Sequence, residues 1–327
     1  REFLHNSAMA AVAVRLPSIV RAATEPGASA FGALSTAEEV TAGLDLSGKT
    51  AVVTGCNSGL GLETMRVLAM RGAHVIGTGR TEEKARKACD SVKGNTTPVV
   101  LELSDFNSVV DCALRIREIT PTIDMLICNA AVMALQDLEQ VYGLEKQFVV
   151  NHLGHFLLVN LLLDEVIAAP QGRVVMVSSN AHEWAREEGI QFDNLTGERD
   201  YHPFKFYGHS KLANGLFSRE LARRIADTDA TSNSLHPGVI QTNLTRHMPP
   251  EQLEGDWTDK DIPQGAATQC YVAAHPTMSG VSGLYFSDCN PATPNAQMLN
   301  DETAARLWTV SEGITRAYLD KGAKSDG

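Results

Sequence analysis

The sequence is poor in basic residues: 28 lysines and arginines stand against 39 aspartates and glutamates, which gives a formal charge of −11. No basic stripe is available to neutralise a phosphate backbone, and this excludes a role in binding nucleic acid. The chain also lacks internal repeats and low-complexity tracts. Its 327 residues can therefore form one large core.

No pair of cysteines has the spacing of a redox or zinc motif, so we expect reduced, structural thiols. The six cysteines are Cys56, Cys89, Cys112, Cys128, Cys270 and Cys289. His152 and His155 lie three residues apart on a predicted helix and could share one face as metal ligands. No carboxylate or cysteine stands at a matching spacing, and we therefore expect no metal.

No hydrophobic run near the N-terminus is long enough to span a bilayer. The apolar run of residues 8–14 is followed by Arg15, Pro17 and Arg21. Residues 1–4 resemble the tail of a twin-arginine export signal, with a cleavage site at residues 28–30, which would direct the protein to the periplasm. The alternative is an amphipathic arm that lies on the body or on a partner. A cytoplasmic location is favoured.

We interpret residues 1–45 as an N-terminal extension and residues 46–327 as one domain. Ser35 and Glu38 have the spacing of a capping box, which predicts a short helix that ends at Gly43. The extension could also serve as an arm for assembly into a homo-oligomer.

One glycine-rich stretch, residues 50–63, organises the rest of the chain. Apolar residues 51–53 predict a buried strand, and apolar residues from Leu60 onward recur at helical spacing. Gly55, Gly59 and Gly61 therefore lie on a strand-to-helix turn, where the backbone can turn tightly and approach a ligand. The helix start favours a pyrophosphate, although the spacing departs from the Gly-x-Gly-x-x-Gly fingerprint. A glycine-rich turn without a ligand is the alternative.

Strands and helices alternate along the remainder, which predicts an α/β fold with a doubly wound parallel sheet covered on both faces. The predicted strands cover residues 51–53, 74–78, 98–103, 124–128, 173–177, 232–235 and 283–286. The predicted helices begin near residues 82, 207 and 263 and also cover residues 107–119, 138–168 and 302–318.

Two predicted connections, residues 183–206 and 243–262, are longer than ordinary loops. They carry four large apolar side chains, Trp184, Phe192, Met248 and Trp257. Loops at the carboxyl ends of parallel strands usually cover a pocket, so we expect these residues to cover a substrate. Plain surface insertions are the alternative.

The second predicted strand ends at Gly79 and Arg80, where a NAD site would usually place an acidic residue for the ribose. Arg80 can instead pair with a 2′-phosphate, because a guanidinium matches phosphate geometry. We therefore expect NADP as the cofactor, with a merely exposed Arg80 as the alternative.

Three tyrosines are followed by a lysine four residues later, an arrangement in which an ammonium can lower the pKa of a proton-donating phenol. The pairs are Tyr142 with Lys146, Tyr201 with Lys205, and Tyr207 with Lys211. Pro203 disfavours a continuous helical turn across the second pair. The first pair precedes the strand that should bring a second catalytic group, so we select Tyr207 and Lys211.

That second group should be a hydroxyl at the end of a neighbouring strand, where it could hydrogen-bond the substrate oxygen. Ser178 and Ser179 follow the strand at residues 173–177, and Ser179 is the better placed. Asn151 is a costly amide in an apolar helix. We expect it to hold a water that relays protons to Lys211, or alternatively to cap a local kink.

Taken in order, these motifs resemble the short-chain dehydrogenase/reductase family over about residues 46–318. The motifs are Thr54-Gly55-x-x-x-Gly59-x-Gly61, Asn129-Ala130-Ala131, Asn151, Ser179, Tyr207-x-x-x-Lys211 and Pro237-Gly238. The sequence is most similar to the retinol dehydrogenase and WW-domain oxidoreductase branch, on residues 151–156, 207–214 and 262–267.

The resemblance implies a Rossmann-type oxidoreductase that transfers a hydride between NADP(H) and a carbonyl or alcohol of an apolar small molecule, of retinoid or steroid type. Tyr207 would be the general acid/base, Lys211 would lower its pKa and hold the nicotinamide ribose, and Ser179 would orient the carbonyl. Asn151 would complete the proton relay.

The resemblance also implies a set of cofactor-binding residues, in which Glu102 replaces the aspartate that the family commonly places near the adenine. The set is Gly55, Asn57, Ser58, Gly59, Leu60, Gly61, Arg80, Glu102, Leu103, Asn129, Ala130, Ala131, Tyr207, Lys211, Pro237, Gly238, Ile240 and Thr242. A catalytically silent dinucleotide sensor or interaction protein on the same fold is the alternative function.

Overall fold

The computed structural model describes residues 27–185, 187–253 and 258–323. The export signal or arm expected at residues 1–26, and Trp257, lie outside the described residues. Residues 27–45 contact the body of the protein. The Phe31 ring lies 6.0 Å from the ring of Tyr271, and Glu38 pairs with Arg66.

The short helix predicted near residue 38 is present as α1 (Ala37–Val40), but the predicted capping residues are wrong by one position. Thr36 and Glu39 form the capping box. The Ser35 hydroxyl instead accepts a hydrogen bond from the Gly32 amide. The spacing motif occurs twice in overlapping positions, and the sequence did not separate the two.

Eight strands of the described chain form one sheet, in the order β10-β9-β8-β7-β4-β1-β2-β3. Every neighbouring pair is parallel except β9 and β10. The strands are β1 (Thr50–Val53), β2 (His74–Gly79), β3 (Thr96–Val100), β4 (Met125–Cys128), β7 (Arg173–Val177), β8 (Thr231–His236), β9 (Tyr285–Ser287) and β10 (Asn290–Pro291). The predicted strand at residues 98–103 is therefore displaced by two or three residues.

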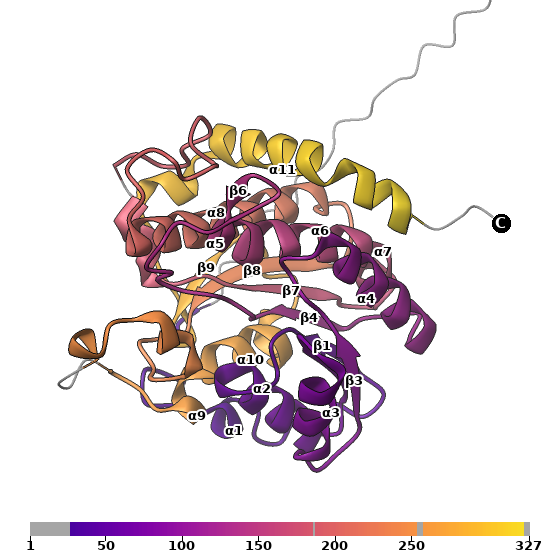
Figure 1. Cartoon of the computed structure of the whole chain (residues 1–327). Helices are drawn as coiled ribbons and strands as arrows, with labels where there is room; N and C mark the ends of the chain where they lie inside the picture. The colour runs from indigo at the N-terminus through magenta and orange to yellow at the C-terminus, as the bar shows by residue number, and fades with distance from the viewer. Residues whose placement is uncertain (1–26, 186, 254–257, 324–327) are drawn as a thin grey trace, which may run out of the picture.

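Helices cover both faces of the sheet (Figure 1), and each face has its own hydrophobic cluster. One layer holds α4 (Phe106–Ile119), α6 (Gly154–Leu161), α7 (Leu163–Ile167), α8 (Pro203–Arg224) and α11 (Asp301–Gly322). The other holds α1, α2 (Gly59–Met70), α3 (Glu82–Asp90), α9 (Ile262–Gly265) and α10 (Ala267–Ala274). The predicted doubly wound α/β fold is confirmed. No helix in the described part of the chain is long and apolar enough to cross a membrane.

The long helix predicted over residues 138–168 is wrong in its first part. There, β5 (Gln140–Val141) and β6 (Leu144–Glu145) form a hairpin. Its two-residue turn has positive φ at Tyr142 (55°) and Gly143 (71°), the geometry that hairpins favour and helices forbid. The helical region that follows is divided into α5 (Lys146–Phe148), a π-helix (Val149–Leu153), α6 and α7.

The sheet order places a crevice at its centre. Strand β1 pairs with β2 on one side and with β4 on the other, so the chain leaves the carboxyl ends of β1 and β4 in opposite directions. Ligands of doubly wound sheets bind at this switch point.

Candidate active site

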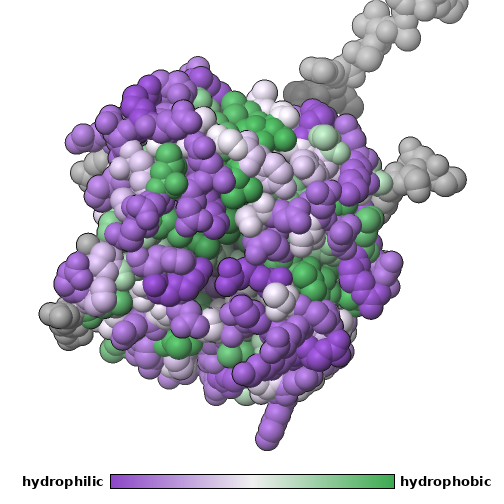
Figure 2. Space-filling view, in the orientation of Figure 1, coloured by the Kyte–Doolittle hydropathy of each residue, from purple (hydrophilic) through white to green (hydrophobic). Residues whose placement is uncertain are grey.

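A cleft of about 830 Å³ lies at the carboxyl ends of the parallel strands. Figure 2 shows a hollow near the middle of this face, with hydrophobic residues along its rim. The segments that follow β1, β2, β3, β4, β7 and β8 all contribute to its lining. Every predicted site residue lines the cleft except Gly61 and Asn151.

Gly61 acts through packing. A Cβ atom on Gly61 would lie 2.4 Å from the Gly55 carbonyl oxygen and 2.6 Å from Asn129 Nδ2. The missing side chain thus lets α2 begin directly against the turn. Gly55 adopts φ 73°, and a Cβ there would lie 2.9 Å from the Ala130 Cβ. This tight cradle at the start of α2 fits a dinucleotide pyrophosphate.

A chain of buried hydrogen bonds joins the glycine turn to the interior. The Thr54 hydroxyl accepts the amide protons of Asn129 (2.8 Å) and Ala130 (2.9 Å), and it lies 2.9 Å from His155 Nε2. His155 Nδ1 lies 3.0 Å from the Asn151 carbonyl oxygen. Burial lowers the pKa of His155 to about 4. A neutral His155 ring that donates from Nδ1 to the Asn151 carbonyl and accepts the Thr54 hydroxyl proton at Nε2 is compatible with all four of these hydrogen bonds.

The Asn151 side chain is fully buried within the π-helix. Its Oδ1 accepts from the Val132 amide, and its Nδ2 donates to the Val132 carbonyl and the Ser210 hydroxyl, each at 2.9 Å. The amide therefore has the partners that its burial requires, and it positions the segment after β4. Its place in a π-helix agrees with the alternative of a local kink, and the proton relay stays a prediction.

The two histidines considered as metal ligands bind different partners. His152 Nε2 lies 2.8 Å from the Ser311 hydroxyl, whereas His155 contacts Thr54 and Asn151. Within the described ranges, no group of three histidine, cysteine, aspartate or glutamate residues could hold a metal ion. All six cysteines are free and buried, as predicted.

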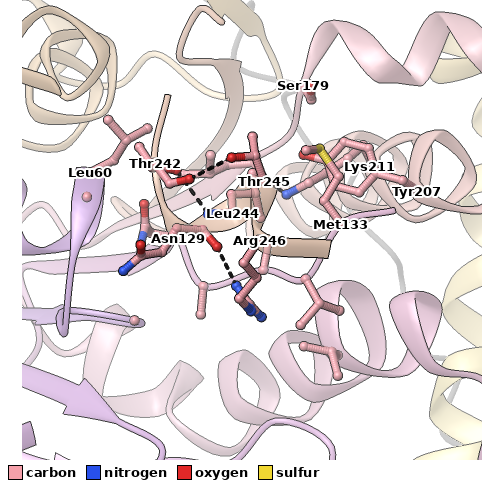
Figure 3. A pocket seen from close by; sticks show the side chains of 18 of the residues that line it. Leu60, Asn129, Met133, Ser179, Tyr207, Lys211, Thr242, Leu244, Thr245 and Arg246 are labelled. Carbon is pink, nitrogen blue, oxygen red and sulfur yellow. Dashed lines mark hydrogen bonds between the residues drawn. The ribbon is translucent and has the colours of Figure 1, made fainter. Parts of the chain in front are cut away.

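Tyr207, Lys211 and Ser179 all line the cleft, and Figure 3 shows the Tyr207 and Lys211 side chains next to each other. Pro203 occupies the first turn of α8, where its missing N–H costs no helical hydrogen bond, and Tyr207 and Lys211 lie one turn apart on this helix. The Lys211 amine lies 5.6 Å from the centre of the Tyr207 ring and donates to the Val177 carbonyl at 2.9 Å.

The lowered pKa that the sequence predicted for Tyr207 is not found in the protein alone. Burial raises the pKa of Tyr207, and a hydrogen bond with the Ser179 side chain opposes this increase. Burial also lowers the pKa of Lys211 to about 7. The sequence pattern could not weigh desolvation, which dominates at both groups.

The other two tyrosine–lysine pairs form no such site. Tyr142 lies in the hairpin turn and accepts a hydrogen bond from the Phe106 amide. Tyr201 precedes α8 and donates to the Leu135 carbonyl at 2.7 Å. Neither tyrosine lines the cleft, so the selection of Tyr207 agrees with the structure.

The part of the cleft next to Tyr207 is largely apolar. Trp184 packs edge-on against Phe204, with ring centroids 5.5 Å apart, and lies 6.3 Å from the Tyr207 ring. Other apolar lining residues are Met133, Leu135, Leu244 and Met248. Trp184 and Met248 were predicted to cover a pocket. Phe192 was also predicted, but it packs against the core, beneath the Arg306 guanidinium.

No sequence pattern indicated several of the lining residues, because they lie on irregular segments. Met133, Leu135, Phe204 and Leu244 belong to this set. Lys84 also lines the cleft, one turn after Arg80 at the start of α3, and its spacing could have indicated it.

Comparison with known proteins decides the family. A family model described as short chain dehydrogenase matches residues 49–253. The chain belongs to this family. It is 41% identical over 301 residues to short-chain dehydrogenase TIC 32 B of Brassica napus. The aligned region covers 87% of this chain and 94% of that protein.

The predicted branch of the short-chain dehydrogenases is also confirmed. The chain is 40% identical to human retinol dehydrogenase 11 over 290 residues (86% of this chain, 90% of that protein). It is 37% identical to the human WW domain-containing oxidoreductase over 300 residues (87% and 72%). A crystal structure of an uncharacterised protein from Mycobacterium paratuberculosis is 33% identical, with a TM-score of 0.69 (85% and 97%).

Proposed function

We propose that this short-chain dehydrogenase interconverts an alcohol and a carbonyl on an apolar small molecule, with NADP(H) as its cofactor. The observation that supports the proposal most strongly is that Tyr207, Ser179 and Lys211 line one cleft together with the glycine turn, with the Lys211 amine 5.6 Å from the centre of the Tyr207 ring. We retain residues 46–327 as the enzyme domain and residues 1–45 as its extension in this proposal.

The chain's own residues account for the proton in the reaction. A bound nicotinamide would supply or accept the hydride. In reduction, Tyr207 gives its phenolic proton to the oxygen of the substrate, and in oxidation it takes the proton back. Ser179 hydrogen-bonds the same oxygen and stabilises its charge. Lys211, with a pKa of about 7, can supply a proton or positive charge next to the phenol.

Three features support the finer parts of the proposal. Arg80 lines the cleft at the end of β2, where no carboxylate stands to bind a ribose diol. The apolar residues around Trp184 suit a hydrophobic substrate. The human relative is named retinol dehydrogenase, which describes an apolar alcohol.

A turnover assay tests this function. The purified chain is incubated with NADPH or NADH and with two aldehydes, all-trans-retinal as an apolar substrate and glyceraldehyde as a hydrophilic one. We expect faster reduction of retinal and faster turnover with NADPH. Cofactor binding without turnover across a broad panel of carbonyls would instead indicate a silent dinucleotide-binding protein. A preference for NADH would contradict the role of Arg80.

A further inference from the structure

Three cations that line the cleft have no acidic partner in the described part of the chain. Among the residues that the structure describes, no carboxylate lies within ion-pair distance of Arg80, Lys84 or Arg246. Many other arginines of this acidic protein do pair with carboxylates, as Arg219 does with Asp301 at 2.7 Å. Unpaired cations that face one cavity indicate that an anionic ligand completes them.

Arg246 reaches the cleft from the segment that follows β8, whose local structure is well defined. The Thr242 hydroxyl accepts from the Leu244 amide at 3.2 Å, and Thr245 donates to the Thr242 carbonyl at 3.0 Å. Thr242 also lies over the start of α2, because a Cβ on Gly59 would be 3.2 Å from its methyl group.

This anchoring directs Arg246 into the cleft. Figure 3 shows its side chain extending into the pocket between Asn129 on one side and Lys211 on the other. Its guanidinium donates to the Asn243 carbonyl at 2.8 Å, which leaves other N–H groups free to bind a ligand.

Arg246 and Arg80 line the same cleft. Burial, and then the positive charge of Arg80, lower the pKa of Arg246. Such repulsion is unfavourable in the protein alone, and a dianionic group between the two guanidinium groups would turn it into attraction on both sides.

We propose that Arg246 is a second arginine for the 2′-phosphate of NADP(H), opposite Arg80. This inference rests on the proposed use of NADP(H). Because the same segment supplies Leu244 and leads to Met248, binding of the phosphate would also hold part of the apolar substrate wall in place. The 2′-phosphate would then contribute to substrate binding as well as to cofactor affinity.

The test measures dissociation constants by isothermal titration calorimetry on the full chain, with NADP+, NAD+ and 2′,5′-ADP as probes. We expect Arg246→Ala to weaken NADP+ and 2′,5′-ADP about tenfold or more, the effect of one lost charge-assisted hydrogen bond, and to leave NAD+ unchanged. Arg115→Ala is the matched control, because Arg115 pairs with Glu118 on the surface of α4.

The outcomes separate this inference from the proposed function. If wild-type protein prefers NADP+ and Arg246→Ala binds it equally well, the inference is overturned and the proposed cofactor stands. Equal weakening of NADP+ and NAD+ also overturns it, since Arg246 would then contact the pyrophosphate. If wild-type protein shows no preference for NADP+, the proposed cofactor fails together with the inference. Loss of NADP+ affinity in Arg80→Ala, alongside Arg246→Ala, supports both.

Discussion

Replacing Thr54 with valine tests whether one buried hydroxyl holds the nucleotide turn together. Thr54 is fully buried at the end of β1, and valine has nearly the same shape. The substitution removes the hydroxyl that accepts the Ala130 amide proton and that contacts His155 Nε2. It also removes the closer of the two oxygens that accept the Asn129 amide proton. Because valine fills the same volume, the substitution leaves no cavity, and any loss of stability comes from the lost hydrogen bonds.

The magnitude follows from counting the groups left without a partner. The Asn129 amide retains a contact with the Ile127 carbonyl at 3.2 Å. Among the described residues, the Ala130 amide and His155 Nε2 have no other hydrogen-bond partner, and both lie in or beside the core. Each unsatisfied polar group costs about 1–3 kcal/mol, so the two groups together should make Thr54→Val lower the free energy of unfolding by about 2–6 kcal/mol.

Urea denaturation followed by circular dichroism measures this loss. Thr315→Val in α11 is the matched control, because the Thr315 hydroxyl is also fully buried but donates only to the Ser311 carbonyl of its own helix. We expect the control to cost less than about 1 kcal/mol. Equal costs for the two variants would refute the reasoning, because the Thr54 hydroxyl would then contribute no more than a helical side chain.

Two further substitutions test the glycine turn and the buried lysine. Gly61→Ala should destabilise the protein and weaken nucleotide binding, although alanine has the better helix propensity, because the new Cβ would meet the Gly55 carbonyl oxygen. Gly313→Ala in α11 is the control, because its Cβ would meet nothing within 4 Å, and it should stabilise the protein by up to about 1 kcal/mol. Thermal unfolding of both variants measures the difference, and equal shifts in melting temperature would contradict the close approach at Gly61. The pKa of Lys211 falls from 10.5 to about 7 on folding, so the unfolded chain binds more protons above pH 7 and Lys211 makes the free energy of unfolding rise with pH by about 1.4 kcal/mol per unit. Denaturation of the nucleotide-free protein between pH 7 and 9 should show a slope that Lys211→Met lacks, and identical slopes would show that Lys211 is not desolvated.

Local patterns predicted those parts of the molecule that local physics determines. Alternation of apolar strands with amphipathic helices was sufficient for the doubly wound sheet, and the glycine spacing was sufficient for the turn at the start of α2. Tyr207 was preferred because Pro203 disfavours a helical turn across the earlier pair, and α8 does begin at this proline.

The remaining features depend on contacts between distant segments. The hairpin at residues 140–145 depends on positive φ at Tyr142, which the apolar periodicity of that region did not indicate. The partners of Asn151 include Ser210, 59 residues away, and no sequence pattern links them. Arg246 enters the cleft on a segment whose Thr242 packs over the distant Gly59, and no sequence pattern indicated this contact.

The most direct test of the catalytic assignment compares Tyr207→Phe with wild-type protein in a single turnover of retinal by preloaded NADPH. Loss of the phenolic proton donor should slow the reaction by about 100-fold or more, while NADPH binds with unchanged affinity. Tyr142→Phe, which alters a tyrosine outside the cleft, should react at the wild-type rate. A Tyr207→Phe protein that reduces retinal as fast as the wild type would contradict the account.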